Sequence, residues 1–200
     1  LAATLSAEIK KNWFYAQARN YPSSLEASLS RENIPREVYD NLIKAVNNNL
    51  SYLHQYVTLR KKVLHLDKVH IYDLYVPLVS DYTLNIPYEK AQKMLLEGLE
   101  PLGGEYLTLM KKGFENRWID VYETKNKATG GYSWGAYDTH PYILMNYDDT
   151  ADSMLTLAHE MGHALNSYYT HTTQKYINSQ TPIFTAEVAS TMNENLMLEY

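Results

Sequence analysis

The chain has 200 residues, a net charge of −5 and no cysteine, and 45% of its residues are hydrophobic whereas 20% are charged. This length and composition are typical of one soluble globular domain or of a piece of a larger one. The negative charge argues against a nucleic-acid partner, the longest apolar runs are too short to span a membrane, and the lack of cysteine excludes disulfides and thiolate metal ligands. Any bound metal must therefore be held by histidine and carboxylate side chains.

The two ends of the sequence predict a fragment of a longer protein. The chain begins at Leu1 without an initiator methionine or a signal peptide, and it stops at Tyr200 inside a helical pattern. We expect a cytoplasmic location, and we leave the oligomeric state open.

Residues 1–117 show the periodicity and the end signals of a helical scaffold. The apolar run from Ile71 to Val79 contains Pro77, which weakens a strand assignment, so this run is left unassigned. Helices are predicted at Ser6–Arg19, Pro35–Leu64, Pro87–Leu99 and Tyr106–Glu115.

The pattern changes at Trp118, where residues 118–200 begin a second region that we predict to be the zinc-binding catalytic region. Residues 118–122 and 137–147 are rich in β-branched and aromatic residues and flank a turn-prone stretch, which predicts a small antiparallel sheet. The last strand, about Tyr142–Tyr147, leads almost directly into the next helix and places a strand edge beside it. Such an edge either binds an extended peptide by main-chain hydrogen bonds or is covered by the rest of the protein.

The next helix contains the pattern His-Glu-x-x-His, formed by His159, Glu160 and His163. Residues four apart lie on one face of a helix, so the two imidazoles can converge on one cation, and Glu160 flanks them. Two neutral imidazoles and a third protein ligand leave one position on zinc open for water, whose pKa falls to about 7 while a carboxylate accepts its proton. The motif therefore predicts a zinc hydrolase site.

The sequence around the motif supports a helix. Asp149 or Thr150 can cap its first turn, and Gly162 indicates that another backbone passes close to it. Its predicted buried stripe consists of Met154, Leu157, Ala158, Met161, Ala164, Leu165 and Tyr168.

A third zinc ligand must come from elsewhere. The metzincin pattern requires glycine and histidine where this chain has Asn166 and Tyr169, so that class is excluded. His171 falls in a polar stretch, and we interpret it as a surface histidine in a loop. The carboxylates that follow the motif are Glu187, Glu194 and Glu199.

The second helix of this region is predicted from Pro182 to at least Leu198, with Thr181 as its cap. Glu187 shares one face with Ser190, Thr191 and Glu194, a row that can supply one ligand and hydrogen bonds that support a ligand histidine. The predicted packed stripe of this helix consists of Phe184, Val188, Met192 and Leu196.

The motif at residues 159–163, followed by Phe-Thr-Ala-Glu-Val-Ala-Ser-Thr-Met-Asn-Glu-Asn-Leu from Phe184, resembles the thimet-oligopeptidase-like family of zinc peptidases, above all oligoendopeptidase F. The stretch 135–147 is also similar to that subgroup. The resemblance implies a mainly α, zincin-type catalytic domain with one zinc ion per chain. It implies that the zinc ligands are His159, His163 and Glu187 and that the general base is Glu160.

This resemblance further implies cleavage of internal bonds in short, unstructured peptides that enter a deep channel. In the family, the residues that stabilise the tetrahedral intermediate lie downstream of the second zinc helix, which here means beyond Tyr200. Two alternatives to a zinc endopeptidase stay open. One is a peptide-binding fragment that binds zinc but has little or no turnover, and the other is a helical structural domain with a chance motif.

Overall fold

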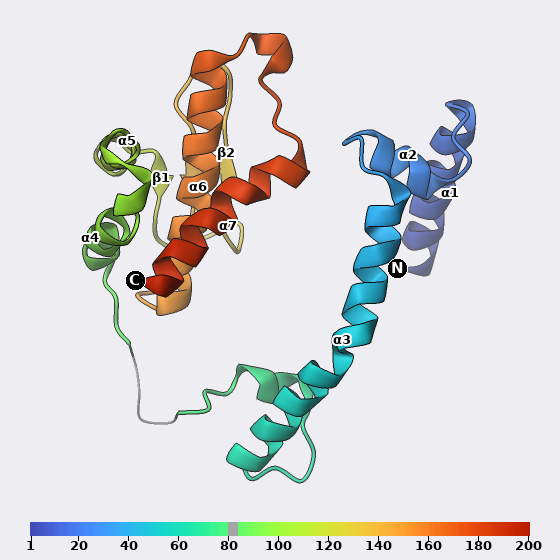
Figure 1. The fold of residues 1–200 in the computed structure, drawn as a ribbon, viewed down its shortest axis with the longest axis horizontal. Coiled ribbons are helices and arrows are strands. Elements are labelled where there is room, and N and C mark those ends of the chain that lie inside the picture. Colours follow the sequence, from blue (N-terminus) through green and yellow to red (C-terminus); the bar gives the residue numbers. More distant parts are fainter. Residues whose placement is uncertain (80–83) are drawn as a thin grey trace. The chain divides into compact units, whose positions relative to one another are not determined.

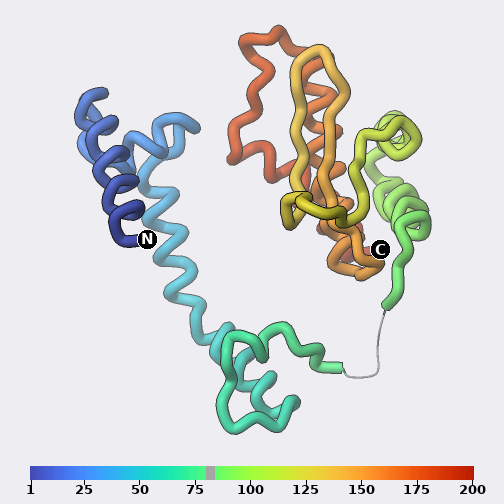
Figure 2. The backbone as a smooth tube through the Cα atoms, turned by 180° about the vertical axis from the view of Figure 1, so that it is seen from behind, coloured from blue at the N-terminus to red at the C-terminus, as the bar shows by residue number. Residues whose placement is uncertain are grey.

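The computed structural model describes residues 1–79 and 84–200 and contains two compact units, Leu1–Tyr82 and Thr83–Tyr200. Figure 1 shows both units as ribbons, and Figure 2 shows the same chain from behind. The predicted division into residues 1–117 and 118–200 stays a prediction about the domains of the protein. Of the helices in the described ranges, none is long and apolar enough to cross a membrane.

The first unit is helical. It contains α1 (Ala2–Ala18), α2 (Ser24–Ser30), α3 (Arg36–Val63) and the short 3-10 helix η1 (Ile71–Tyr75). Two of these were predicted, although α1 begins earlier than expected. Only residues Ile71–Tyr75 of the unassigned run Ile71–Val79 form η1. The helix α2 was missed although Ser23 caps it by accepting hydrogen bonds from two backbone N–H groups.

The second unit packs helices and a small sheet around one core. Its buried centre includes Leu95 of α4 (Tyr88–Gly98), Met110 of α5 (Gly104–Glu115), Ile143 of β3 (Tyr142–Leu144) and the apolar face of α6 (Ala151–Thr173). The predicted stripe of α6 is confirmed, because its members are buried except for the partly buried Tyr168. The elements are α4 (Tyr88–Gly98), η2 (Glu100–Leu102), α5 (Gly104–Glu115), β1 (Ile119–Asp120), β2 (Tyr132–Trp134), β3 (Tyr142–Leu144), α6 (Ala151–Thr173), η3 (Tyr176–Asn178) and α7 (Ile183–Glu199).

The mainly α fold with a small sheet beside the motif helix is confirmed, but the sheet is mixed and not wholly antiparallel. Its strand order is β1-β3-β2, with β1 parallel to β3 and β2 antiparallel to β3. After β1 the chain first forms β2 at the opposite edge of the sheet and then returns to form β3 between β1 and β2. The last strand therefore has partners on both sides, and the edge strand that lies beside α6 is β2.

The helix α7 crosses α6 closely (Figure 1), but it uses a different face from the predicted one. Its buried residues are Ser190, Asn193 and Met197. Three members of the predicted stripe are exposed instead, namely Phe184, Val188 and Met192. The reason is steric, because a close helix crossing requires small or well-paired side chains at the contact, whatever the apolar periodicity indicates.

Gly162 lies at this crossing. A Cβ atom at this position would lie 2.7 Å from the Ala189 carbonyl oxygen and 2.7 Å from Ser190 Cα, and neither backbone atom can move by side-chain rotation. We therefore expect Gly162→Ala to lower the free energy of unfolding by about 1–3 kcal/mol, because overpacking outweighs the gain in helix propensity. Gly104→Ala, in open space at the start of α5, is the matched control, and chemical denaturation measures both. If the free energy of unfolding of Gly162→Ala equalled that of Gly104→Ala, the close contact between α6 and α7 at Gly162 would be contradicted.

Candidate metal centre

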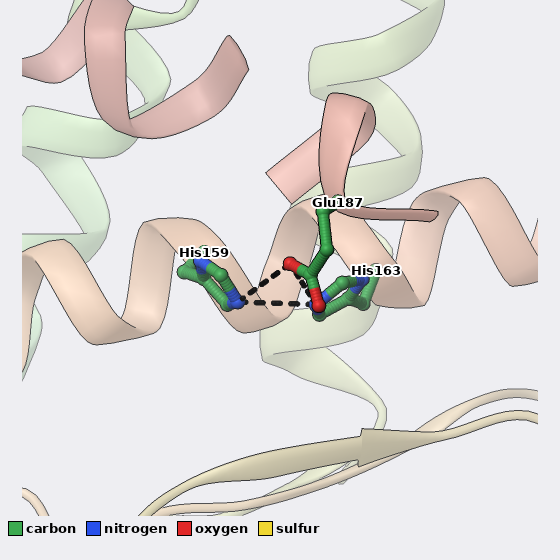
Figure 3. A group of neighbouring side chains, drawn as sticks. All are labelled: His159, His163 and Glu187. Carbon is green, nitrogen blue, oxygen red and sulfur yellow. Dashed lines mark hydrogen bonds and ion pairs between the residues drawn. The ribbon is translucent and has the colours of Figure 1, made fainter. Parts of the chain in front are cut away.

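The motif helix α6 presents His159 and His163 side by side (Figure 3). Thr150 starts the helix, because its side chain accepts a hydrogen bond from the Ser153 N–H at 3.1 Å. Asp148 reinforces this end by accepting hydrogen bonds from the hydroxyls of Thr150 and Ser153, both at 2.6 Å, and these bonds lower the pKa of Asp148. The predicted cap and the predicted pairing of the two imidazoles are thus both present.

Glu187 reaches the two imidazoles from α7. The Nε2 atoms of His159 and His163 lie 3.0 Å apart, and Glu187 Oε2 lies 3.5 Å from the first and 3.3 Å from the second. Donors bound to zinc at about 2.0–2.2 Å in a tetrahedron lie about 3.4 Å from one another, so these separations fit such a site. Within the described ranges, this trio is the group of histidine and carboxylate side chains that could hold a metal ion.

Two further contacts orient this trio. His159 Nδ1–H donates a hydrogen bond to Glu194 Oε1, which leaves the lone pair of His159 Nε2 directed at the other two donors. Ser190 Oγ donates to Glu187 Oε2 at 2.9 Å, and the Ser190 side chain is fully buried. The predicted row on α7 is therefore present, with Glu194 behind an imidazole and Ser190 behind the carboxylate.

The His163 ring is also suited to metal binding. Burial lowers its pKa, and the nearby Glu187 carboxylate opposes this effect only in part. A lowered pKa keeps the imidazole neutral at pH 7, which is the form that binds a metal.

Glu160 is buried beside the trio, with 6% of its surface exposed. Its Oε2 atom has no hydrogen-bond partner among residues 1–79 and 84–200, and its carboxylate interacts with the backbone N–H of Ser133 in β2. Burial raises the pKa of Glu160, as does its neighbour Glu187. A buried carboxylate with an orphaned oxygen and a raised pKa is able to take up a proton from a group that approaches the trio.

The remaining candidates lie outside the trio. Thr191 donates to the Glu187 backbone oxygen of its own helix, and Glu199 is exposed at the end of α7. The interpretation of His171 as a loop histidine is wrong, because it lies in the last turn of α6 and its ring packs against Tyr137 at 5.8 Å. Polar composition alone suggested a loop there, whereas α6 continues to Thr173.

Sequence reasoning missed Ser133 and Asn193, which lie next to Glu160 and Glu194. A serine between Tyr132 and Trp134 has the alternation of a strand, and this pattern could have placed its side chain on the inner face of the sheet. For Asn193 no local signal exists, because its partners come from two other helices.

The chain is similar to known peptidases. Oligopeptidase PepF of Bacillus subtilis (strain 168) is 54% identical over 200 residues, which are 100% of this chain and 30% of that protein. An oligoendopeptidase F homolog of Lactococcus lactis is 43% identical over 99% of this chain and 33% of its own length. The crystal structure of oligoendopeptidase-F from Enterococcus faecium matches with a TM-score of 0.60 and 36% identity, covering 100% of this chain and 27% of that one.

The chain thus spans 30% to 33% of the length of these two curated relatives. The sequence profile of Peptidase family M3 matches residues 1–200, and the predicted resemblance is confirmed. This chain belongs to peptidase family M3.

Proposed function

We propose that this chain carries the catalytic metal site of a zinc-dependent endopeptidase that hydrolyses internal bonds of short, unstructured peptides. The observation that carries the proposal is the convergence of two imidazole nitrogens and one carboxylate oxygen next to a buried carboxylate with an unpaired oxygen. The names of the relatives, oligopeptidase and oligoendopeptidase, support peptides as the substrates.

His159, His163 and Glu187 would hold one zinc ion per chain. Two nitrogens and one oxygen are a common ligand set of catalytic zinc, and the donor separations fit it. When bound there, zinc would polarise the scissile carbonyl and make water acidic enough to react at neutral pH. Ser190 and Glu194 would hold Glu187 and His159 in place through the hydrogen bonds already described.

Glu160 would act as the general base. Its unpaired Oε2 can accept the proton of the attacking water and later deliver this proton to the leaving amine. The raised pKa of the buried carboxyl favours both halves of this exchange, because the proton is held more tightly than by an exposed glutamate.

The edge of β2 would align the substrate. Ile143 N–H donates to Trp118 O at 2.7 Å, so the main chain of Ile143 faces β1. Ser133 is opposite Ile143 in register, so its N–H and C=O point away from β3 toward the free edge. The Ser133 N–H lies against Glu160, which leaves the Ser133 carbonyl to accept an N–H of an extended peptide next to the base.

Hydrolysis of a short, internally quenched peptide by the full-length protein tests this function. We expect cleavage at an internal bond, loss of cleavage after treatment with a chelator, and recovery when zinc is added. A folded protein substrate is expected to stay intact. Zinc binding without cleavage would favour the alternative of a peptide-binding protein that holds zinc but has little or no turnover. Cleavage that resists the chelator would overturn the metal site. The predicted cytoplasmic location stays a prediction.

A further inference from the structure

Asn193 is a buried amide that joins three helices. Its side chain, in α7, is 1% exposed. Asn193 Nδ2 donates to the Ala158 backbone oxygen of α6 at 2.9 Å, and the Tyr106 hydroxyl of α5 donates to Asn193 Oδ1 at 2.9 Å. Both ends of the amide are therefore paired, as a buried polar group requires.

The two residues joined by the hydrogen bond between α7 and α6 each directly precede, in the sequence, a residue that belongs to or supports the metal site. Ala158 precedes His159, and Asn193 precedes Glu194. The hydrogen bond from Asn193 to Ala158 thus lies one residue away, on both helices, from the hydrogen bond between His159 and Glu194. Any slide of α7 along α6 that moves Glu194 away from His159 must also break the bond made by Asn193.

Tyr106 fixes which way the amide faces. Because its hydroxyl donates to Oδ1, the NH2 group of Asn193 is directed at Ala158 and not away from it. Burial raises the pKa of Tyr106 to about 12, so the hydroxyl keeps its proton and stays a donor at neutral pH.

We propose that Asn193 is a positioning residue of the metal site, which acts through Glu194 to set the orientation of His159, with Tyr106 holding the amide in place. This inference rests on the proposed function, because it takes His159 as a ligand. Groups that orient a ligand histidine usually change metal affinity by about 10–100-fold when they are removed.

Asn193→Leu removes the amide while keeping a side chain of similar size, and Tyr106→Phe removes only the hydroxyl. Zinc affinity is measured by competition with a chelator, well below the unfolding temperature, and the absorption spectrum of the Co²⁺-loaded protein reports the ligand geometry. We expect Asn193→Leu to bind zinc about 10–100-fold more weakly with an altered Co²⁺ spectrum, and Tyr106→Phe to shift both in the same direction by less.

Met197→Ala is the matched control. Met197 is 5% exposed on the same helix, and its sulfur lies 2.7 Å from the position that a Cβ atom on Gly98 of α4 would take. This variant is expected to lower the thermal stability of the metal-free protein but to leave zinc affinity and the Co²⁺ spectrum unchanged.

Three results would overturn the positioning role. They are an Asn193→Leu protein with the affinity and spectrum of the wild type, a Met197→Ala protein that loses as much affinity as Asn193→Leu, and a Tyr106→Phe protein that is indistinguishable from the wild type. The last result decides the case if Asn193→Leu does not fold. Failure of the wild type itself to bind zinc would instead refute the proposed function, so the two failures are distinguishable.

Discussion

Replacing Glu160 by glutamine in the full-length protein is expected to abolish most peptide hydrolysis while zinc stays bound. Glutamine keeps the size of the side chain and its place beside the trio, but it cannot accept a proton from water. Loss of a general base usually lowers the rate by about 10²–10⁴-fold, so kcat/KM for a short peptide should fall by at least this amount. Zinc content and kcat/KM, measured on the same preparation, check both halves of the prediction.

Glu115→Gln is the matched control for this substitution. Glu115 lies at the end of α5, where its side chain is 61% exposed and forms an ion pair with Lys111 at 3.8 Å. This change should leave hydrolysis at the wild-type rate. Near-normal turnover by Glu160→Gln would remove the assigned role of Glu160 and require another base.

Replacing Glu187 by alanine is expected to weaken zinc binding more than replacing Glu194 by alanine. This change removes one of the three donors, whereas Glu194→Ala removes a group that only supports His159. Glu187→Ala should therefore weaken zinc binding by more than the roughly 10–100-fold expected for Glu194→Ala. Competition with a chelator measures both affinities.

The order of these two effects identifies the ligand. If Glu194→Ala weakened zinc binding more than Glu187→Ala, Glu194 would be the third ligand and the arrangement in Figure 3 would have to change in the zinc-bound protein. Ser190→Ala provides a smaller test of the same arrangement. It removes the hydrogen bond that holds Glu187 Oε2, and we expect a loss of zinc affinity in the range of Glu194→Ala.

The part of the site that lies on α6 could be predicted because it is local. The period of a helix places His159 and His163 on one face whatever the rest of the protein does. The apolar residues around them and the cap at Thr150 predicted that helix without knowledge of its partners.

The third donor could not be obtained from spacing alone. Three carboxylates were candidates for the third ligand, namely Glu187, Glu194 and Glu199. The resemblance to a known family selected Glu187. The structure places Glu187 next to the two imidazoles and Glu194 behind His159, a distinction that depends on how α7 crosses α6. Such a crossing is set by contacts between residues far apart in the sequence, here around Gly162.

The same limit explains the errors in the sheet and on α7. Richness in β-branched and aromatic residues predicted strands within 118–122 and 137–147, but β2 at Tyr132–Trp134 was missed. Strand order depends on the path of the chain between β1 and β2, which composition does not encode. On α7, the apolar stripe predicted burial of Phe184 and Val188, whereas the buried contact is made by the polar residues Ser190 and Asn193. Ser190 donates to Glu187 within α7 and Asn193 donates to Ala158 of α6, and these hydrogen bonds make this burial possible.

The most direct test of the central claim is the zinc content of the purified protein, measured after dialysis without added metal. The account predicts one zinc ion per chain, removed by a chelator together with peptide hydrolysis and restored by added zinc. A folded protein that contains no zinc and takes up none when it is supplied would contradict the claim that His159, His163 and Glu187 form a metal site.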